Sequence, residues 1–182
     1  MIKRALIILA DGFEETEAVG PIDILRRAGV DVTIAGLSGK EISGGHGIKV
    51  LADKTLDDVS EEYDALILPG GGGGADNLSR SEKVKTLIRE MNDKGKIVAA
   101  ICASPAVVLS PTGILNKKRA TCYPGMEDAF PADTVCSKNP VVVDGNIITS
   151  RGPGTALLFG IKLAELLVGK DKADDVRKGM LI

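Results

Sequence analysis

Short, wholly apolar runs alternate along this chain with segments whose apolar residues recur at helical spacing. A short run of aliphatic residues suits a strand buried on both faces and is too short for a helix. Four such runs predict the central strands of a sheet, at residues 5–10, 30–37, 63–68 and 97–101.

Amphipathic segments lie between these strands and after the last one. Residues 14–29 open with acids, continue with apolar residues at helical spacing and end at a glycine, although Pro21 is expected to bend or delay this helix. A second helix is expected to begin at its cap Ser81 and to end at Gly95. Residues 156–168 and 172–178 predict two more helices near the C-terminus.

The order of these elements determines the fold class. Strand–helix–strand units imply parallel pairing with right-handed crossovers, and two glycine-centred segments, 41–50 and 141–149, predict hairpins. We therefore expect an α/β fold with an open, doubly wound, mostly parallel sheet sandwiched between helices. No internal repeat or linker interrupts the pattern, so residues 1–182 are expected to form a single domain.

Composition excludes several classes of partner. Hydrophobic residues make up 44% of the chain and aromatic residues 3%, which predicts an aliphatic core. The formal net charge is -2 with mixed signs, so nothing favours binding to nucleic acid or to an anionic membrane. There is neither a signal peptide nor an apolar run long enough for a membrane span. Three cysteines without close pairing suit the cytoplasm, and a single histidine argues against a zinc site or other metal centre.

Cys102 follows the strand 97–101 directly, and a helix is expected to begin after it with Ser104 as its cap and Pro105 in its first turn. This is the geometry of a nucleophile elbow, although the usual G-x-S-x-G letters are absent. Unpaired backbone N–H groups and the helix dipole would favour the thiolate there. The alternative is a buried structural cysteine, which is a common environment for a free thiol.

Glycines 70–74 form a second candidate group at the end of the strand 63–68. The run formally fits a dinucleotide fingerprint, but its helix is expected to start several residues too late, and a P-loop would need a following Gly-Lys-Ser/Thr. We prefer a turn whose backbone N–H groups face Cys102 and stabilise an oxyanion. A merely permissive loop is the alternative.

Acids at the start of the first helix form a third group. Glu14, Glu15 and Glu17 would ordinarily serve the helix dipole in water. One that faced Cys102 would be protonated near neutrality, because burial and a like charge both disfavour the carboxylate. Ligands of doubly wound sheets bind beyond the carboxyl ends of the strands, where all three groups are expected to converge. The residues alone do not identify the acid.

Four motifs in order along the chain carry a family resemblance: LADGFEETE at 9–17, LPGG at 68–71, AAICA at 99–103 and TSRGPGT at 149–155. Together they resemble the ThiJ/PfpI superfamily, and more narrowly its branch containing the parkinsonism-associated deglycase. The resemblance implies a flavodoxin-like sandwich with a nucleophile-elbow cysteine, a homodimer and no cofactor.

The resemblance also assigns roles. It implies that Cys102 is the reactive cysteine and that Glu17 is the protonated acid hydrogen-bonded to it. The remaining assignments are backbone donors for an oxyanion at Gly70, Gly71 and Ala103, and pocket residues at Tyr123, Arg151 and Pro153. For Arg151 a structural salt bridge near the dimer contact is an equal alternative.

The chain departs from the family at one position. Several relatives place a histidine beside the cysteine, where this chain has Tyr123. The single histidine, His46, lies in the glycine hairpin and is expected to be an exposed turn residue. A Cys–His dyad is therefore not expected, and neither is a peptidase or amidotransferase activity.

The resemblance implies an enzyme that detoxifies 2-oxoaldehydes such as methylglyoxal and glyoxal to 2-hydroxy acids without glutathione, the activity of glyoxalase III. Cys102 would form a hemithioacetal and Glu17 would move the proton. Glycated proteins and amino acids are further expected substrates. The alternatives are a non-enzymatic oxidative-stress sensor or redox chaperone acting through oxidation of Cys102, and, last, a cysteine hydrolase.

Overall fold

The computed structural model describes residues 2–182. Its α-helices are α1 (Glu15–Arg27), α2 (Gly72–Arg80), α3 (Glu82–Asp93), α4 (Ala156–Val168) and α5 (Lys170–Gly179). Its strands are β1 (Arg4–Leu9), β2 (Asp31–Gly36), β3 (Glu41–Ser43), β4 (Lys49–Leu51), β5 (Lys54–Thr55), β6 (Ala65–Leu68), β7 (Ile97–Ile101), β8 (Arg119–Ala120), β9 (Val135–Cys136), β10 (Val141–Asp144) and β11 (Ile147–Ser150).

The strands of the main sheet follow the order β10-β11-β7-β6-β1-β2-β5. Its neighbours are parallel except for the predicted hairpin β10–β11, which is antiparallel. From β1 the chain goes to β2 on one side and later to β6 and β7 on the other. The order therefore reverses at β1, and a crevice opens beyond the carboxyl ends of β1 and β6.

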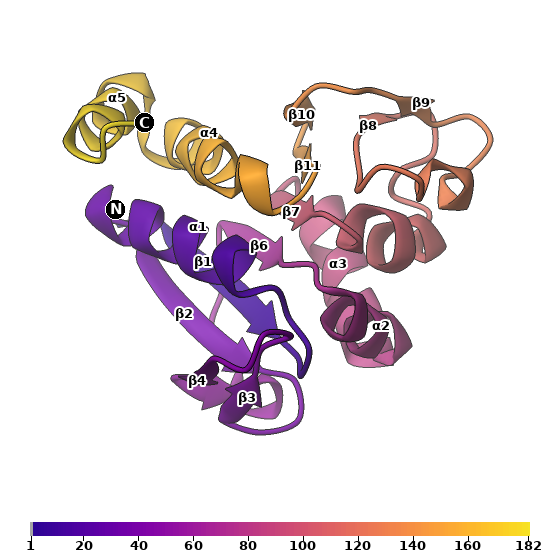
Figure 1. Cartoon of the computed structure of the whole chain (residues 1–182), viewed down its shortest axis with the longest axis horizontal. Helices are drawn as coiled ribbons and strands as arrows, with labels where there is room; N and C mark the ends of the chain where they lie inside the picture. The colour runs from indigo at the N-terminus through magenta and orange to yellow at the C-terminus, as the bar shows by residue number, and fades with distance from the viewer. Residues whose placement is uncertain (1) are drawn as a thin grey trace.

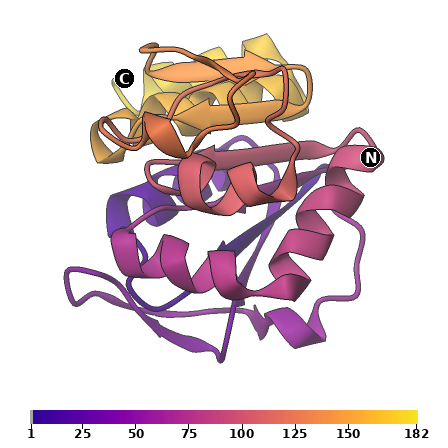
Figure 2. The same cartoon turned by 90° about the vertical axis from the view of Figure 1, so that its right-hand side faces the viewer.

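Helices cover both faces of this sheet. Helices α1, α4 and α5 lie on one face and α2 and α3 on the other, while the small hairpin β3–β4 projects beyond β2 (Figures 1 and 2). The predicted doubly wound, flavodoxin-like α/β sandwich is thus confirmed. Within residues 2–182, no helix combines the length and the apolar character that crossing a membrane requires.

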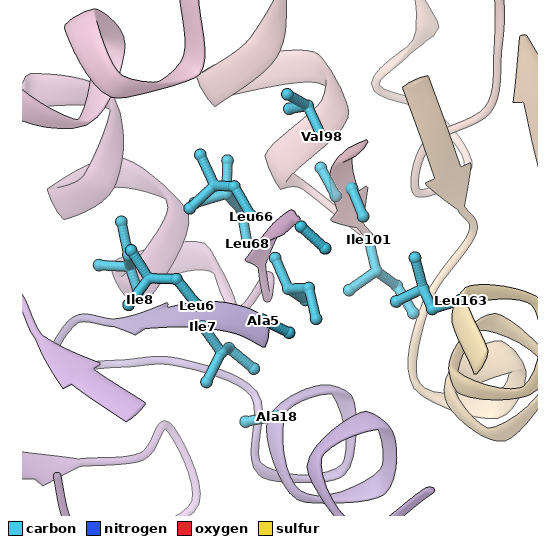
Figure 3. Packing of buried hydrophobic residues seen from close by; sticks show 14 of the residues in the cluster. Ala5, Leu6, Ile7, Ile8, Ala18, Leu66, Leu68, Val98, Ile101 and Leu163 are labelled. Atoms are coloured by element: carbon cyan, nitrogen blue, oxygen red, sulfur yellow. The ribbon is translucent and has the colours of Figure 1, made fainter. Parts of the chain in front are cut away.

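The core is aliphatic, and the pleat of the strands divides it between the two faces. Leu6 of β1 is in register with Leu66 of β6, and both turn toward α3, while Ile7 turns toward Ala18 of α1 (Figure 3). Ile101, the last residue of β7, points toward Leu163 of α4 (Figure 3). All are buried. Strands covered on both faces explain why the sequence shows continuous apolar runs rather than alternation.

Helix α1 runs through Pro21 from Glu15 to Arg27, so Pro21 does not delay its start. The expectation that the glycine run would stay a loop was wrong, because α2 begins at Gly72. Glycine is a poor helix former, but here its lack of a side chain allows the first turn of α2 to pack on the turn after β1. A Cβ at Gly74 would lie only 2.7 Å from Cα of Phe13. Tertiary packing therefore overrides helix propensity at this point.

The segment after Cys102 also differs from the regular capped helix that was expected. Residues Pro105–Leu109 form a π-helical turn, and Ser110–Thr112 continue it as a 3-10 turn. Ser104 precedes this segment but does not cap it with its side chain, since its backbone is already helical and its hydroxyl donates to the carbonyl of Pro69 at 2.6 Å. A helical segment that starts at Pro105 is confirmed, but it is not a regular α-helix and the expected capping bond is not made.

Helices α1 and α4 cross at a glycine. A Cβ at Gly160 would lie 2.8 Å from Cδ1 of Ile24 and 3.1 Å from Cα of Pro21, so the backbone of α4 packs directly on α1. The Pro21 contact is to backbone, which cannot rotate away.

We expect Gly160→Ala to destabilise the fold by about 1–3 kcal/mol, because overpacking outweighs the roughly 1 kcal/mol gained in helix propensity. Gly179→Ala is the matched control, since its Cβ would meet no atom within 4 Å, and it should be neutral or stabilising. Urea unfolding of the two variants measures both effects. Equal stability of the two variants would contradict the close crossing.

Candidate active site

Cys102 lies at a strained turn between β7 and the π-helical segment. Its φ is +66°, in the left-handed region that costs a non-glycine residue of order 1–3 kcal/mol. Two backbone hydrogen bonds hold this conformation: the Cys102 N–H donates to Ser150 O (3.0 Å), and the Tyr123 N–H donates to Cys102 O (2.8 Å). The sharp turn expected at Cys102 is therefore present, with the side chain largely but not wholly buried.

Glu17 is fully buried in the first turn of α1. Its backbone N–H donates to Oε2 of Glu14, the N-cap residue, at 2.7 Å. Its own carboxyl accepts the Gly70 N–H at Oε2, at 2.8 Å. The other oxygen, Oε1, is buried and finds no hydrogen-bond donor among the residues that the structure describes.

The glycines after β6 pack so closely on these two residues that no side chain would fit. A Cβ at Gly70 would lie 2.6 Å from Cβ of Cys102 and 2.7 Å from Oε2 of Glu17. Gly71 has φ +85°, and a Cβ there would lie 2.3 Å from Gly12 O. The need for glycine here is steric as well as conformational.

The backbone amides around the site act on two different groups, the Cys102 sulfur and the Glu17 carboxyl. The N–H groups of Gly71 and Ala103 lower the pKa of the Cys102 thiol, as expected for donors that stabilise an anion. The Gly70 N–H is instead taken up by Glu17. Of the three backbone positions expected to form the oxyanion site, Gly71 and Ala103 act on the sulfur and Gly70 acts on the acid.

Burial raises the pKa of Glu17 to about 7. The hydrogen bonds with Cys102 and Gly70 lower this pKa, and the charge of Glu14 raises it by a smaller amount. Burial, followed by the Glu17 carboxylate, raises the pKa of the Cys102 thiol to about 12, although the Gly71 and Ala103 amides lower it. The expected backbone donors thus favour the thiolate, but burial and the Glu17 carboxylate outweigh them.

The two groups act as one pair. A proton on Glu17 removes the negative charge beside the sulfur and turns the carboxyl into a hydrogen-bond donor. The two amides then stabilise the thiolate without an opposing charge. Protonation of Glu17 would therefore lower the pKa of the Cys102 thiol.

The expected pocket residues occupy different positions. Tyr123 is 47% exposed, and a Cβ at Gly152 would lie 3.3 Å from its ring and 4.0 Å from Oε1 of Glu17. Tyr123 and Gly152 thus lie beside the acid, and Gly152 is a site residue that sequence reasoning missed. Pro153 is exposed and begins a 3-10 turn.

The Arg151 side chain contacts the loop that contains Lys138. Its Nη1 donates to Lys138 O at 3.4 Å, so it braces that segment by a hydrogen bond rather than by the salt bridge considered above. Its charge lowers the pKa of both Cys122 and Cys136, against the larger effect of burial, which raises them.

His46 is exposed, as expected, but it is not free. Its Nδ1 lies 2.9 Å from Oε2 of the buried Glu15, whose Oε1 accepts the His46 N–H at 2.7 Å. Burial raises the pKa of Glu15, but these hydrogen bonds and that of Ile48 lower it overall to about 2. Glu15 therefore fastens the turn of the β3–β4 hairpin to the start of α1.

Glu14, Glu15 and His46 each offer one ligand atom within 4.8 Å of the others, a spacing that a metal ion could bridge. Their oxygens already accept backbone hydrogen bonds, and the positive end of α1 disfavours a cation. We assign the group to holding the hairpin.

A cavity of about 340 Å³ lies far from this chemistry. It is lined by Leu6, Tyr63, Leu66, Met91 and Lys96 among others, which places it at the amino ends of the strands. Cys102 and Glu17 lie at the opposite edge of the sheet. Because this second edge combines a nucleophile, an acid and anion-stabilising amides, we take it as the candidate active site.

The sequence of this chain is similar to known proteins of one family. Residues 3–166 match the model of the DJ-1/PfpI family. Protein dj-1beta of Drosophila melanogaster is 44% identical over 100% of this chain and 98% of its own length, and the Parkinson disease protein 7 homolog of Danio rerio is 41% identical over 99% and 97%.

Solved structures agree as well. The crystal structure of Drosophila melanogaster DJ-1beta superposes with a TM-score of 0.96 at 43% identity and covers 100% of this chain and 99% of that one. The oxidized DJ-1 of Toxoplasma gondii gives 0.95 at 39% identity, with 98% of each chain covered.

The raised pKa of Glu17 predicts a pH dependence of stability. Because the folded-state pKa of about 7 exceeds the ordinary value of 4.5, this group's contribution is fully present below pH 4.5 and is lost as the pH rises toward 7. The loss amounts to about 3 kcal/mol.

Glu17→Gln does not titrate, so the stability of the variant minus that of the wild type should rise by about this amount from pH 4.5 to 7. Urea unfolding across this range measures the difference, and Glu14→Gln should show a much weaker trend. A difference independent of pH would rule out a protonated Glu17.

Proposed function

Because the chain belongs to the DJ-1/PfpI family, we propose that it is a cysteine-dependent enzyme converting 2-oxoaldehydes to 2-hydroxy acids without glutathione, as glyoxalase III does. Methylglyoxal and glyoxal are the proposed substrates. The observation that carries the proposal is the buried Glu17 carboxyl beside Cys102, with a pKa raised to about 7. An acid that gains and loses a proton near neutral pH is what an internal proton transfer requires.

The first step is addition. The Cys102 sulfur attacks the aldehyde carbon, a C–S bond forms, and the carbonyl π electrons pass to the oxygen, which takes the proton of Glu17. The product is a hemithioacetal bound to the enzyme, and Glu17 is left as a carboxylate. The Gly71 and Ala103 amides lower the pKa of the Cys102 thiol and so stabilise the negative charge on the sulfur before it attacks.

The next steps move two protons and add one water. Glu17 removes the proton from the former aldehyde carbon and returns it to the adjacent carbon, while the proton of the hemithioacetal hydroxyl passes to the former ketone oxygen, so the hemithioacetal becomes a thioester of the 2-hydroxy acid. Water then cleaves the thioester, releasing the acid and restoring Cys102. The sum is 2-oxoaldehyde plus water to 2-hydroxy acid, so no redox cofactor is consumed. Tyr123 and Gly152, beside Glu17, would shape the opening.

The same adduct chemistry supports a wider substrate range. Early glycation products carry a carbon at the oxidation level of a hemiacetal, so glycated proteins and amino acids are proposed as additional substrates. The three free thiols suit a reducing compartment, and we place the activity in the cytoplasm.

A redox sensor or chaperone is the second candidate, and a specific observation favours it. A similar structure, that of Toxoplasma gondii DJ-1, is of an oxidized protein. In this chain two peroxide molecules would convert the Cys102 thiolate to a sulfinate with release of two waters. The Gly71 and Ala103 amides and protonated Glu17 would donate to the new oxygens. A hydrolase is disfavoured for two reasons: His46 is held by Glu15, and a tyrosine, such as Tyr123, is a poor general base.

We also propose that the protein is a homodimer. Large apolar side chains on three adjoining elements are exposed: Val19 of α1, Ile48 of the β3–β4 hairpin and Leu157 of α4. A Cβ at Gly20 would lie 3.3 Å from Cδ2 of Leu157, so α1 and α4 present one continuous surface. Such a surface is a candidate interface between two copies.

We expect Leu157→Arg to convert the dimer to a monomer, because a charge on each copy would be desolvated at the contact. Light scattering after size exclusion measures the mass, and Leu181→Arg, at the exposed C-terminus, is the control that should remain dimeric. A wild-type monomer would refute the dimer, and a dimeric Leu157→Arg variant would refute this face.

Purified protein should convert methylglyoxal to lactate, and both Cys102→Ala and Glu17→Gln should lower the rate by at least about 100-fold, in the range typical for removal of a nucleophile or a general acid–base. Proton NMR of the reaction identifies lactate directly. Glu14→Gln, which removes a neighbouring charge but not the reacting acid, should reduce the rate far less.

Two results would decide between the candidates. No lactate from the wild type, together with peroxide oxidation of Cys102 to the sulfinate, would replace the enzyme with the sensor. Cleavage of casein or glutamine that depends on Cys102 would promote the hydrolase.

A further inference from the structure

We propose that Ser104 is a positioning residue for Glu17. Its buried hydroxyl holds the Pro69–Gly70 peptide so that the Gly70 amide occupies Oε2 of Glu17 and leaves Oε1 to carry the proton exchanged with Cys102. This inference deepens the proposed function, on which the role of Glu17 in turnover rests.

The first observation concerns the serine itself. Ser104 is fully buried two residues after the reactive cysteine, between apolar neighbours, and it does not cap the following segment. A buried hydroxyl needs a partner, and this one donates to Pro69 O at 2.6 Å. The bond spans 35 positions of sequence and joins the segment after β7 to the loop after β6.

The second observation is that the accepting carbonyl belongs to the peptide group that serves the acid. Pro69 C=O and Gly70 N–H are parts of one planar unit, and the Gly70 N–H donates to Oε2 of Glu17 at 2.8 Å. Fixing the oxygen of this unit fixes the direction of its N–H. A donor at the carbonyl also polarises the group and makes its N–H a stronger donor.

A further contact holds the next peptide. The Glu14 N–H donates to Gly70 O at 3.1 Å, so the N-terminus of α1 and the glycine loop are joined on both sides of Gly70. The room around this residue is already filled, since a Cβ there would touch Cys102 and Glu17. The loop has little freedom to present a different group to the carboxyl.

The third observation concerns the second carboxyl oxygen of Glu17. Oε1 of Glu17 is buried and has no donor within residues 2–182. An unsatisfied buried acceptor is costly, and protonation turns it into a donor. The side chain that interacts with the carboxyl is Cys102, and Glu14 is the other ionisable group acting on it. With Oε2 occupied, the proton belongs on Oε1.

Removal of the hydroxyl has a predictable sign. Without it the Gly70 N–H becomes a weaker and less well-directed donor, and the ionised form of Glu17 loses stabilisation. Glu17 then holds its proton to a higher pH. We expect an increase of about threefold or more in proton affinity, an upward shift of about half a pH unit.

The test uses Ser104→Ala and follows alkylation of Cys102 by iodoacetamide between pH 5 and 9, read by peptide mass spectrometry. Ionisation of Glu17 should appear as a step near pH 7 in the alkylation rate of the wild type. The step should move to higher pH in Ser104→Ala and should vanish in Glu17→Gln. Ser104→Gly, which also lacks the hydroxyl and fits wherever serine fits, should move the step in the same direction. Ser104→Thr, which keeps the hydroxyl, should leave it in place.

Ser110→Ala is the matched control. Ser110 also donates its hydroxyl to a backbone carbonyl, that of Pro105 at 3.2 Å, but this bond does not lead to Glu17. The control should alter stability at most and leave the step near pH 7 unchanged.

An unchanged step in both Ser104→Ala and Ser104→Gly, whatever their thermal stability, would show that Ser104 only packs the turn. Because alkylation needs no substrate, the result is independent of turnover. A shifted step in a protein that produces no lactate would leave the positioning role intact and remove the proposed function.

Discussion

The burial of one carboxyl group, that of Glu17, is the constraint on which the rest of this site depends. A carboxylate out of water needs donors or a proton, and the structure provides the Gly70 amide at Oε2 but no donor for Oε1 within the described residues. That shortage keeps the proton on the acid near neutral pH. The same proton decides whether the neighbouring sulfur sees a charge or a hydrogen-bond donor.

The fold supplies this environment by bringing three chain segments together where the strand order reverses. Helix α1 begins after β1 and carries the acid, the loop after β6 brings the bare backbone of the glycines, and the turn after β7 brings Cys102. The strain at Cys102, with φ +66°, is supported by bonds to Ser150 and Tyr123, which belong to two further segments. The site is therefore a product of the whole sheet edge rather than of one motif.

Much of this was predictable from the sequence, for identifiable reasons. Aliphatic runs predicted the central strands because strands buried on both faces have no polar positions, and Cys102 stood out because it ended one of them. The start of α2 was missed because Gly73 and Gly74 pack on the turn after β1, a contact that no local signal records. Ser104 was misassigned as a cap for a similar reason, since its partner Pro69 is 35 positions away. The choice of Glu17 over Glu14 and Glu15 came from the family resemblance, not from the acids themselves.

The close packing around Gly70 and Gly71 separates the reactivity of Cys102 from substrate preference, two properties that often change together in enzymes. Neither position has room for a side chain, so the parts that set the reactivity of Cys102 cannot be varied without loss of the fold. The loop that carries Tyr123 reaches the elbow through a backbone bond, and its side chain is half exposed. Under the proposed function, selection or laboratory evolution for a new aldehyde would therefore accumulate changes in the loop after β8, while the chemistry at the sheet edge stayed constant. Substrate preference would then be the evolvable property and reactivity the inherited one.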